Sequence, residues 1–255
     1  MFKKNIKKIL NSLGFTLHKY NKNRVCLDAE SFIPFSDASS SEENTLYHEA
    51  IKKSKNENTD NFPKKLRYYS LHQLVTYVLN QKDVFDFVEC GCWKGHSSYI
   101  ISKLISNSNR KINFHIFDSF EGLSNATQND GSFYLKNEKE KNQVYKYFSS
   151  SENFVRDILK GFPFVKIYRG WIPDRFEDVK DKYFSFVNID VDLFEPTYES
   201  LKYFYPKLKK GGIIVCDDYN YSDFPGAKKA WDKYFKDKDY SFFYQIPFGA
   251  CFIIK

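Results

Sequence analysis

The stretch FSFVNIDVDLFEPTYESL, residues 184–201, sets the pattern on which the chain is built. It begins with an apolar, strand-forming run, passes through two aspartates one residue apart, Asp190 and Asp192, and continues as a helical pattern. Two carboxylates at a strand tip repel each other unless a cation lies between them. The stretch therefore predicts a buried strand, a helix after it, and a functional site where the strand ends.

Apolar strands alternate with helical patterns on both sides of this stretch. Further strands are expected at residues 84–91, 112–118, 164–170 and 211–218, and helices at 66–78, 96–106, 197–208 and 226–235. Two closing strands flank a Pro-Phe-Gly turn within residues 240–255. The alternation predicts an α/β fold with a mostly parallel sheet, helices on both faces and a C-terminal antiparallel hairpin. Ligands of such sheets bind at the carboxyl ends of the strands.

The composition is that of a folded chain. It has 255 residues, of which 42% are hydrophobic and 19% aromatic, enough for one large domain with a substantial core. The net charge is +7, but acidic and basic residues are interleaved except in the basic residues 1–24. We predict a terminal helix there that packs on the domain, with contact to a membrane surface or an anionic partner as the alternative. We expect no nucleic-acid partner.

The pattern of apolar residues and cysteines predicts a cytoplasmic protein. No apolar run has transmembrane length, and the N-terminus lacks the apolar segment of a signal peptide. The 5 cysteines form no C-x-x-C pair, and three of them lie in strand-like runs, which favours reduced, buried thiols. A bias towards Asn, Lys, Tyr, Phe and Ile indicates a bacterial source.

Two segments are predicted to lie outside the regular alternation. Residues 28–64 are polar and expected to be irregular, with SDASSSEENT as the clearest loop. We therefore divide the chain into a partly helical N-terminal extension, 1–65, and a domain, 66–255. Residues 123–150 form a polar insertion between the second and third strands. A surface helix is expected there, with a mobile lid over the site as the alternative.

The first strand end, FVECGCWKGHSS (residues 87–98), predicts a cofactor site. Glu89 closes the strand, Gly91 permits a tight turn, and Gly95 lets the next helix begin close to a ligand. Glu89 stands at the first glycine position of the dinucleotide fingerprint G-x-G-x-x-G, so the fingerprint is absent. An acid there would repel a pyrophosphate but suits a cationic cofactor such as S-adenosylmethionine.

The second strand end, HIFDSFEG (residues 115–122), adds to this site. Asp118 follows Glu89 by 29 positions (118 − 89) and could accept hydrogen bonds from both ribose hydroxyls of an adenosine. The alternative is an acid that only caps the next helix. Two matched strand ends together predict a nucleoside cofactor.

A metal site is expected where the fourth and fifth strands end. If these strands are neighbours, Asp190, Asp217 and Asp218 converge, and their mutual repulsion calls for a hard divalent cation with oxygen ligands. Mg²⁺ usually keeps waters that a substrate can displace. The alternative is that these acids cap helices or pair with Lys and Arg. Asp192 can face the same cavity and is the candidate general base.

Several of these segments together resemble a known family. DFVECGCWKGHSS, FDSFEGL, YRGWIPD, VNIDVDLFEPTYESLKYFYPKLKKGGIIVCDDY and GAKKAWDKYF look like the TylF/MycF-type macrocin O-methyltransferases, in the same order from about residue 66 to the end. The resemblance implies a Rossmann-like class I methyltransferase fold with a seven-stranded sheet. It also implies S-adenosylmethionine and Mg²⁺ as cofactors, and methylation of a sugar hydroxyl.

The resemblance also assigns residues. The cofactor would be held by Glu89, Gly91, Ser97, Asp118 and Ser119, with Gly170 and Trp171 close to it; the metal by Asp190, Asp217 and Asp218; and Asp192 would act as base. Two positions depart from the family: His96 replaces a second glycine and Pro196 a serine. His96 either narrows the cofactor pocket or, as we favour, simply begins the helix. The extension would shape the acceptor pocket or mediate contacts in a homo-oligomer.

The acceptor stays open between two classes. One is a sugar of a bacterial surface polysaccharide such as capsule, free or nucleotide-activated; Lys136, Lys139 and Lys141 would suit a phosphorylated form. The other is the glycoside of a secondary metabolite.

Other functions explain the pattern less completely. A metal-dependent nucleotide-sugar glycosyltransferase would use the D-x-D but leaves Glu89 unexplained. A nucleotide-sugar dehydrogenase or epimerase needs the missing glycine and a Tyr-x-x-x-Lys pair, whereas Tyr198 and Lys202 lie at the wrong strand end. A catalytically silent binding subunit would not require all four acids.

Overall fold

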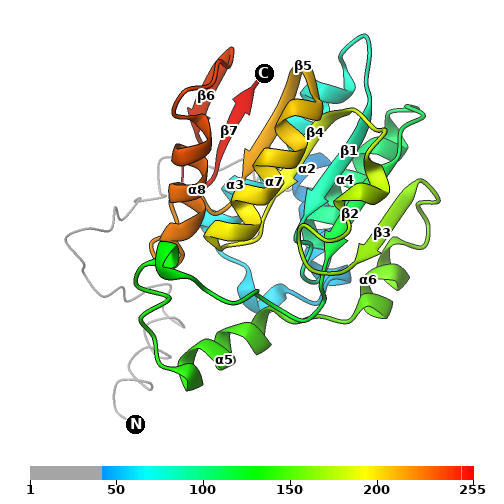
Figure 1. The fold of residues 1–255 in the computed structure, drawn as a ribbon. Helices are drawn as coiled ribbons and strands as arrows, with labels where there is room; N and C mark the ends of the chain where they lie inside the picture. The colour runs from blue at the N-terminus through cyan, green and yellow to red at the C-terminus, as the bar shows by residue number, and fades with distance from the viewer. Residues whose placement is uncertain (1–41, 248) are drawn as a thin grey trace, which may run out of the picture. The chain divides into compact units, whose positions relative to one another are not determined.

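A central sheet organises the computed structural model, which describes residues 42–247 and 249–255 (Figure 1). The predictions for residues 1–41, including the basic helix, lie outside the described residues. The strands are β1 (Asp86–Cys90), β2 (Phe114–Asp118), β3 (Val165–Arg169), β4 (Phe184–Ile189), β5 (Leu208–Cys216), β6 (Phe242–Gln245) and β7 (Cys251–Ile254). Their order in the sheet is β3-β2-β1-β4-β5-β7-β6.

The pairing of the strands confirms the predicted sheet. The first five strands are parallel, whereas β7 runs antiparallel to both β5 and β6. The prediction that the fourth and fifth strands are neighbours is also confirmed. Because Cys90 pairs with Ile189 and Ile189 pairs with Cys216, the residues that follow these three strands emerge side by side.

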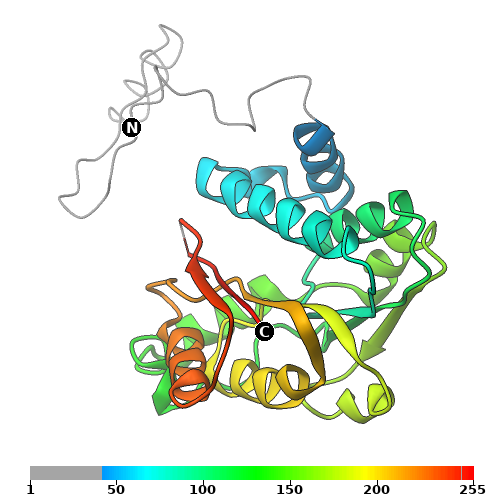
Figure 2. The same ribbon diagram turned by 90° about the horizontal axis from the view of Figure 1, so that it is seen from above.

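Helices cover both faces of the sheet (Figure 2). They are α2 (Glu42–Lys53), α3 (Phe62–Leu79), α4 (His96–Asn107), α5 (Glu138–Phe148), α6 (Glu152–Leu159), α7 (Phe194–Lys207) and α8 (Pro225–Phe235), with short 3₁₀ turns η3 (Glu57–Thr59), η4 (Gln128–Asp130) and η5 (Phe176–Val179). Alternate strand residues face opposite layers. Phe87 joins the core beneath α3, α4 and α6, and Val88 joins the core beneath α7 and α8.

Helix α2 corrects the prediction that residues 28–64 are irregular. Leu46, Tyr47, Ala50 and Ile51 are buried and recur at helical spacing, and α2 packs against α3 and α4. Glu42 and Glu43 lie in the first turn, where negative charge is favourable. The polar residues of the segment concealed a short apolar stripe, so the prediction is wrong for residues 42–53.

Two smaller findings concern location and thiols. Within residues 42–247 and 249–255, none of the helices combines the length and apolarity needed to cross a membrane. The described cysteines, Cys90, Cys92, Cys216 and Cys251, are free and buried.

Candidate active site

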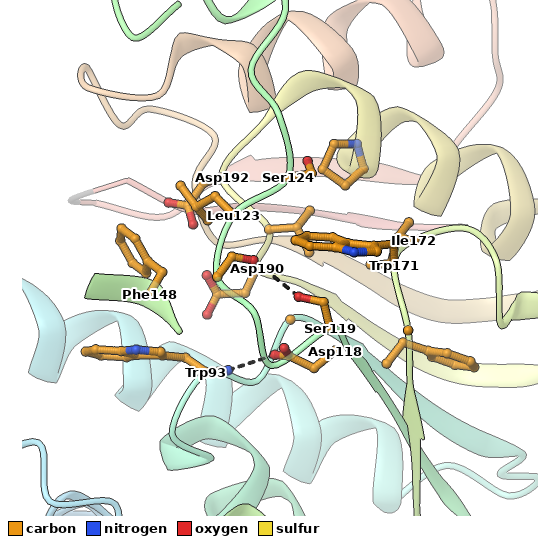
Figure 3. Close-up of a pocket in the computed structure, with 16 residues that line it drawn as sticks. Trp93, Asp118, Ser119, Leu123, Ser124, Phe148, Trp171, Ile172, Asp190 and Asp192 are labelled. Carbon is orange, nitrogen blue, oxygen red and sulfur yellow. Dashed lines mark hydrogen bonds between the residues drawn. The ribbon is translucent and has the colours of Figure 1, made fainter. Parts of the chain in front are cut away.

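A cavity opens at the carboxyl ends of β1, β2, β3 and β4 (Figure 3). Its lining includes Gly91, Trp93, Asp118, Ser119, Leu123, Ser124, Phe148, Gly170, Trp171, Ile172, Asp190, Asp192 and Pro196. Thus Gly91, Asp118, Ser119, Gly170, Trp171, Asp190 and Asp192, all expected site residues, line one cavity. Rings of Trp93, Phe148 and Trp171 supply flat apolar walls, which suit a nucleobase or a sugar.

Asp118 is fixed at the cavity floor by backbone donors. Its Oδ2 accepts hydrogen bonds from the amides of Cys92 (2.7 Å) and Trp93 (3.0 Å), and its Oδ1 accepts one from the amide of Phe120 (2.7 Å). A carboxylate has about four lone-pair sites, so some acceptor capacity remains. Asp118 therefore joins the loops after β1 and β2 and holds a preorganised acceptor at the place expected for ribose hydroxyls.

The two glycines of the first loop have packing reasons for their identity. Gly91 has φ 82°, and a Cβ there would lie 1.9 Å from the carbonyl oxygen of Asp190. Gly95 has φ 75° and directly precedes α4, which begins at His96; a Cβ on Gly95 would lie 2.9 Å from Ile158 Cδ1 of α6. Gly91 thus allows the loops after β1 and β4 to touch, while Gly95 lies away from the cavity lining and lets α4 pack against α6.

Glu89 lies beneath the site rather than in the cavity lining. It is fully buried, where Ser98 Oγ donates to Oε2 and Asn188 Nδ2 donates to Oε1 at 3.1 Å. Ser97 does not line the main cavity but borders a smaller cavity together with Asn188 and Asp190. Burial raises the pKa of Glu89 to about 7. A direct cofactor contact for Glu89 and Ser97 stays a prediction.

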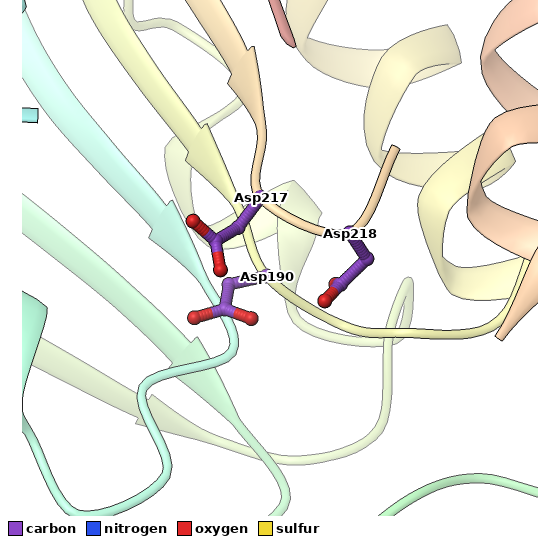
Figure 4. A group of neighbouring side chains, drawn as sticks. All are labelled: Asp190, Asp217 and Asp218. Atoms are coloured by element: carbon purple, nitrogen blue, oxygen red, sulfur yellow. The ribbon is translucent and has the colours of Figure 1, made fainter. Parts of the chain in front are cut away.

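Three aspartates converge next to the cavity (Figure 4). Asp190 follows β4, and Asp217 and Asp218 follow β5; one carboxylate oxygen from each lies within 4.8 Å of the others. Hard oxygen ligands at this spacing form a donor set that fits a hard divalent cation such as Mg²⁺. Asp190 also lines the cavity, so an ion at this cluster would border it.

The charge at the cluster is only partly compensated. Arg67 of α3 forms an ion pair with Asp217 Oδ2. For this one acid, the alternative expectation of pairing with Lys or Arg is therefore met. Burial, followed by the charges of Asp217 and Asp218, raises the pKa of Asp190 well above its usual range. Burial, followed by the charges of Asp192 and Asp217, does the same to the pKa of Asp218.

Asp192 lies at the border between the cluster and the cavity. Its backbone amide donates to Asp218 Oδ2 at 2.9 Å, and its φ of 60° is unusual for a non-glycine residue. Burial and then the charge of Asp190 raise the pKa of Asp192 well above its usual range. A raised pKa makes a carboxylate that faces a cavity a stronger proton acceptor, which fits the predicted role of Asp192 as a base.

The segment 123–150 is anchored over this end of the sheet by residues that the sequence did not mark. Asp130 is buried, and its Oδ1 accepts a hydrogen bond from the amide of Phe194 at the start of α7 (2.7 Å). Phe133 packs against Phe224 and Tyr145 in a small separate core. The expected surface helix is present as α5 (Figure 1). A lid role for the segment stays a prediction.

Sequence reasoning missed Arg67 and Asp130, and among the cavity walls it missed Trp93 and Phe148. Arg67 falls inside a helical pattern and has no local signal of its own. Asp130 stands three residues after Thr127, the spacing of a capping box, which the structure shows at η4. Their partners lie far away in the chain, which only the fold reveals.

Comparisons with known proteins agree with this arrangement. A sequence model of the family described as Macrocin-O-methyltransferase (TylF) matches residues 23–241. The chain is 27% identical over 177 residues to demethyldecarbamoylnovobiocin O-methyltransferase of Streptomyces niveus, covering 66% of this chain and 64% of the relative. It is 25% identical over 158 residues to 8-demethyl-8-(2,3-dimethoxy-alpha-L-rhamnosyl)-tetracenomycin-C 4'-O-methyltransferase of Streptomyces olivaceus, covering 60% of each. The matches therefore span less than two thirds of these relatives' lengths.

A solved structure supports the fold. The O-methyltransferase NovP aligns with a TM-score of 0.62 at 24% identity, covering 75% of this chain and 80% of that chain. Likeness at this identity is evidence about architecture. Together with the strand order, it confirms the expected Rossmann-like class I methyltransferase fold.

Proposed function

The chain belongs to the macrocin-O-methyltransferase (TylF) family, and from this premise we propose that it is an S-adenosylmethionine-dependent O-methyltransferase acting on a sugar hydroxyl. One observation carries the proposal. A cavity whose carboxylate Asp118 is fixed by three backbone amides shares Asp190 with a cluster of three carboxylates that fits a hard cation. One relative's name specifies methylation on a rhamnosyl compound, which supports a sugar as acceptor.

The cofactor would be held at the β1 and β2 ends of the cavity. Asp118 would accept hydrogen bonds from ribose hydroxyls, and Ser119 and Trp171 would border the adenosine. When bound, the cofactor supplies a methyl group activated by a positively charged sulfur. Trp93 and Phe148 would exclude water from the part of the cavity between the bound cofactor and Asp192.

The acidic cluster would hold Mg²⁺ through Asp190, Asp217 and Asp218. When bound, Mg²⁺ orients hydroxyl groups and lowers their pKa. Asp192 would take the proton from the attacking hydroxyl, a role typically worth about 10²- to 10⁴-fold in rate. Its positive-φ turn and the hydrogen bond from its amide to Asp218 keep it beside the metal ligands.

The acceptor site favours an uncharged sugar at the reacting position. Among the described residues that line the cavity there is no Lys or Arg, and the aromatic walls suit the apolar face of a sugar ring. Of the lysines considered for a phosphate, Lys141 already pairs with Glu138. We propose a glycoside or the sugar of a polysaccharide precursor as acceptor, with any nucleotide outside the cavity.

Calorimetric titration with S-adenosylhomocysteine, the expected product, tests the proposal. The Mg²⁺-loaded protein should bind it with micromolar affinity, and Asp118→Asn should weaken binding. Because Asp118 also holds backbone amides, the melting temperature of the variant must be compared with wild type. Asp157→Asn, an exposed change on α6, is the control and should leave affinity unchanged. Absence of binding to the folded wild-type protein would remove the methyltransferase proposal.

The metal role is tested separately by methyl transfer. EDTA should abolish transfer and added Mg²⁺ should restore it. Transfer that is indifferent to chelation would exclude Mg²⁺ while leaving the cofactor site standing.

A further inference from the structure

Arg67 is a permanent cation placed against the acidic cluster. It lies on α3, 150 positions before Asp217 (217 − 67), and its guanidinium contacts the Asp217 carboxylate. The side chains of Arg67 and Asp217 are 17% and 21% exposed. Solvent therefore screens this pair less than it screens a surface pair.

Other cations near α3 have different partners. Lys64 Nζ donates to Thr59 Oγ1 at 2.6 Å, and Lys65 pairs with Asp60 at 4.0 Å. Among the lysines and arginines that the structure describes, Arg67 alone forms an ion pair with an acid of the cluster, Asp217. It also borders a small second cavity together with Asp190 and Asp217, on the α3 side of the cluster.

The charges of the cluster set what a metal ion meets. With all three carboxylates ionised, as binding a metal requires, the cluster carries −3 and Arg67 reduces this to −2, so a divalent cation brings the group to neutrality. The same Asp217 carboxylate must then serve both the guanidinium and the ion. Two cations at one carboxylate repel each other, and at low exposure this repulsion is strong.

We propose that Arg67 is the resident counter-ion of Asp217, which stabilises the metal-free site and lowers its affinity for a divalent cation. This inference rests on the proposed metal role of the cluster. Arg67 is a positioning residue in this scheme: it acts through Asp217 and needs no contact with acceptor or cofactor. In the absence of the ion, the charge of Arg67 compensates the Asp217 carboxylate. In its presence, the same charge weakens the binding of the ion.

The opposite role for Arg67 makes opposite predictions. If the guanidinium mainly orients Asp217 for the metal, then removing it weakens metal binding. If it mainly compensates charge, then removing it strengthens metal binding and destabilises the metal-free protein. The sign of the change in metal affinity separates the two.

The experiment compares the full-length wild type with Arg67→Met, which keeps the length and loses the charge, and Arg67→Lys, which keeps the charge. Mg²⁺ binding is measured by calorimetry near pH 8, and thermal unfolding is measured in EDTA. We expect Arg67→Met to bind Mg²⁺ about tenfold more tightly or better, and to melt at a lower temperature in EDTA. Arg67→Lys should resemble wild type in both measurements. Arg156→Met, which removes an exposed arginine on α6, is the control and should change neither the Mg²⁺ affinity nor the melting temperature in EDTA.

The outcomes distinguish this inference from the proposed function. Equal or weaker Mg²⁺ binding by Arg67→Met, with wild-type binding intact, overturns the inference alone. Absence of Mg²⁺ binding by the wild type overturns the metal role and the inference with it. If Arg67→Met does not fold, Arg67→Gln takes its place, because it also removes the charge. Tighter Mg²⁺ binding by Arg67→Gln supports the inference, and equal or weaker binding overturns it.

Discussion

Replacing Asp130 by alanine tests what holds the segment 123–150 against the loop between β4 and α7, which carries Asp192. The side chain is 1% exposed, and Oδ1 accepts a hydrogen bond from the Phe194 amide at 2.7 Å. Oδ2 accepts hydrogen bonds from the Thr127 amide at 2.7 Å and from Thr127 Oγ1 at 3.2 Å. A single carboxylate thus joins η4 to the start of α7, two residues beyond Asp192.

The expected loss follows from the groups left behind. Alanine leaves the amides of Phe194 and Thr127 without their partner. The Phe194 amide is buried, and a buried orphan donor costs about 1–3 kcal/mol, whereas the Thr127 amide is only half-buried and adds less, so the expected loss is about 1–4 kcal/mol. The carboxylate packs directly against α8, since a Cβ on Gly226 would lie 2.0 Å from Asp130 Oδ1. Asn keeps an oxygen for only one side, so Asp130→Asn should lose about half as much.

Urea unfolding gives the free energy of unfolding, and methyl transfer gives kcat and KM. Both variants should unfold at lower urea, and kcat should fall more than cofactor affinity, because the Asp192 loop loses an anchor. Asp157→Ala, in a pair whose partners are 69% and 76% exposed, is the control and should change stability by less than about 0.5 kcal/mol. A loss below about 1 kcal/mol for Asp130→Ala would refute the reasoning.

Three further changes test other parts of the site. Asp192→Asn should lower turnover about 10²- to 10⁴-fold with unchanged S-adenosylhomocysteine affinity by calorimetry; near-normal turnover excludes it as base. The pKa of Glu89 is raised to about 7 in the folded protein. Protonated Glu89 therefore stabilises the fold at acid pH, and this stabilisation is lost as the pH rises through about 7. In EDTA, the unfolding free energy of Glu89→Gln should therefore vary less than that of wild type between about pH 5 and 8, by roughly 1–3 kcal/mol; parallel curves contradict this. Gly91→Ala should lower the melting temperature and weaken S-adenosylhomocysteine binding, because its Cβ would meet the Asp190 carbonyl at 1.9 Å; wild-type melting would show that the loops can separate.

Much of the fold was predictable because its signals are local. Buried parallel strands are mostly apolar runs, and each of the strands from β1 to β5 lies at a stretch predicted as a strand, although the edge strand β3 is only partly buried. The helix α2 was missed because its apolar stripe is short and surrounded by polar residues, and its helical state depends on packing against α3 and α4.

The chemistry of the candidate site was partly predictable for the same reason. Acids directly after strands are visible in the sequence, and parallel strands bring their carboxyl ends to one edge. The convergence of Asp190 with Asp217 nevertheless depended on β4 and β5 being neighbours, which no local pattern specifies.

The sequence by itself determined the succession of the strands and of most helices, though not α2 and α6, together with the acids at the strand ends and the family. Only the tertiary structure decided that Glu89 lies beneath the cavity, that Arg67 pairs with Asp217, and that Asp130 caps α7. Periodicity and turn chemistry act over a few residues, whereas these contacts join groups 64 to 150 positions apart. Such contacts exist only once the burial of the core has fixed the positions of α3, α7 and the sheet relative to one another.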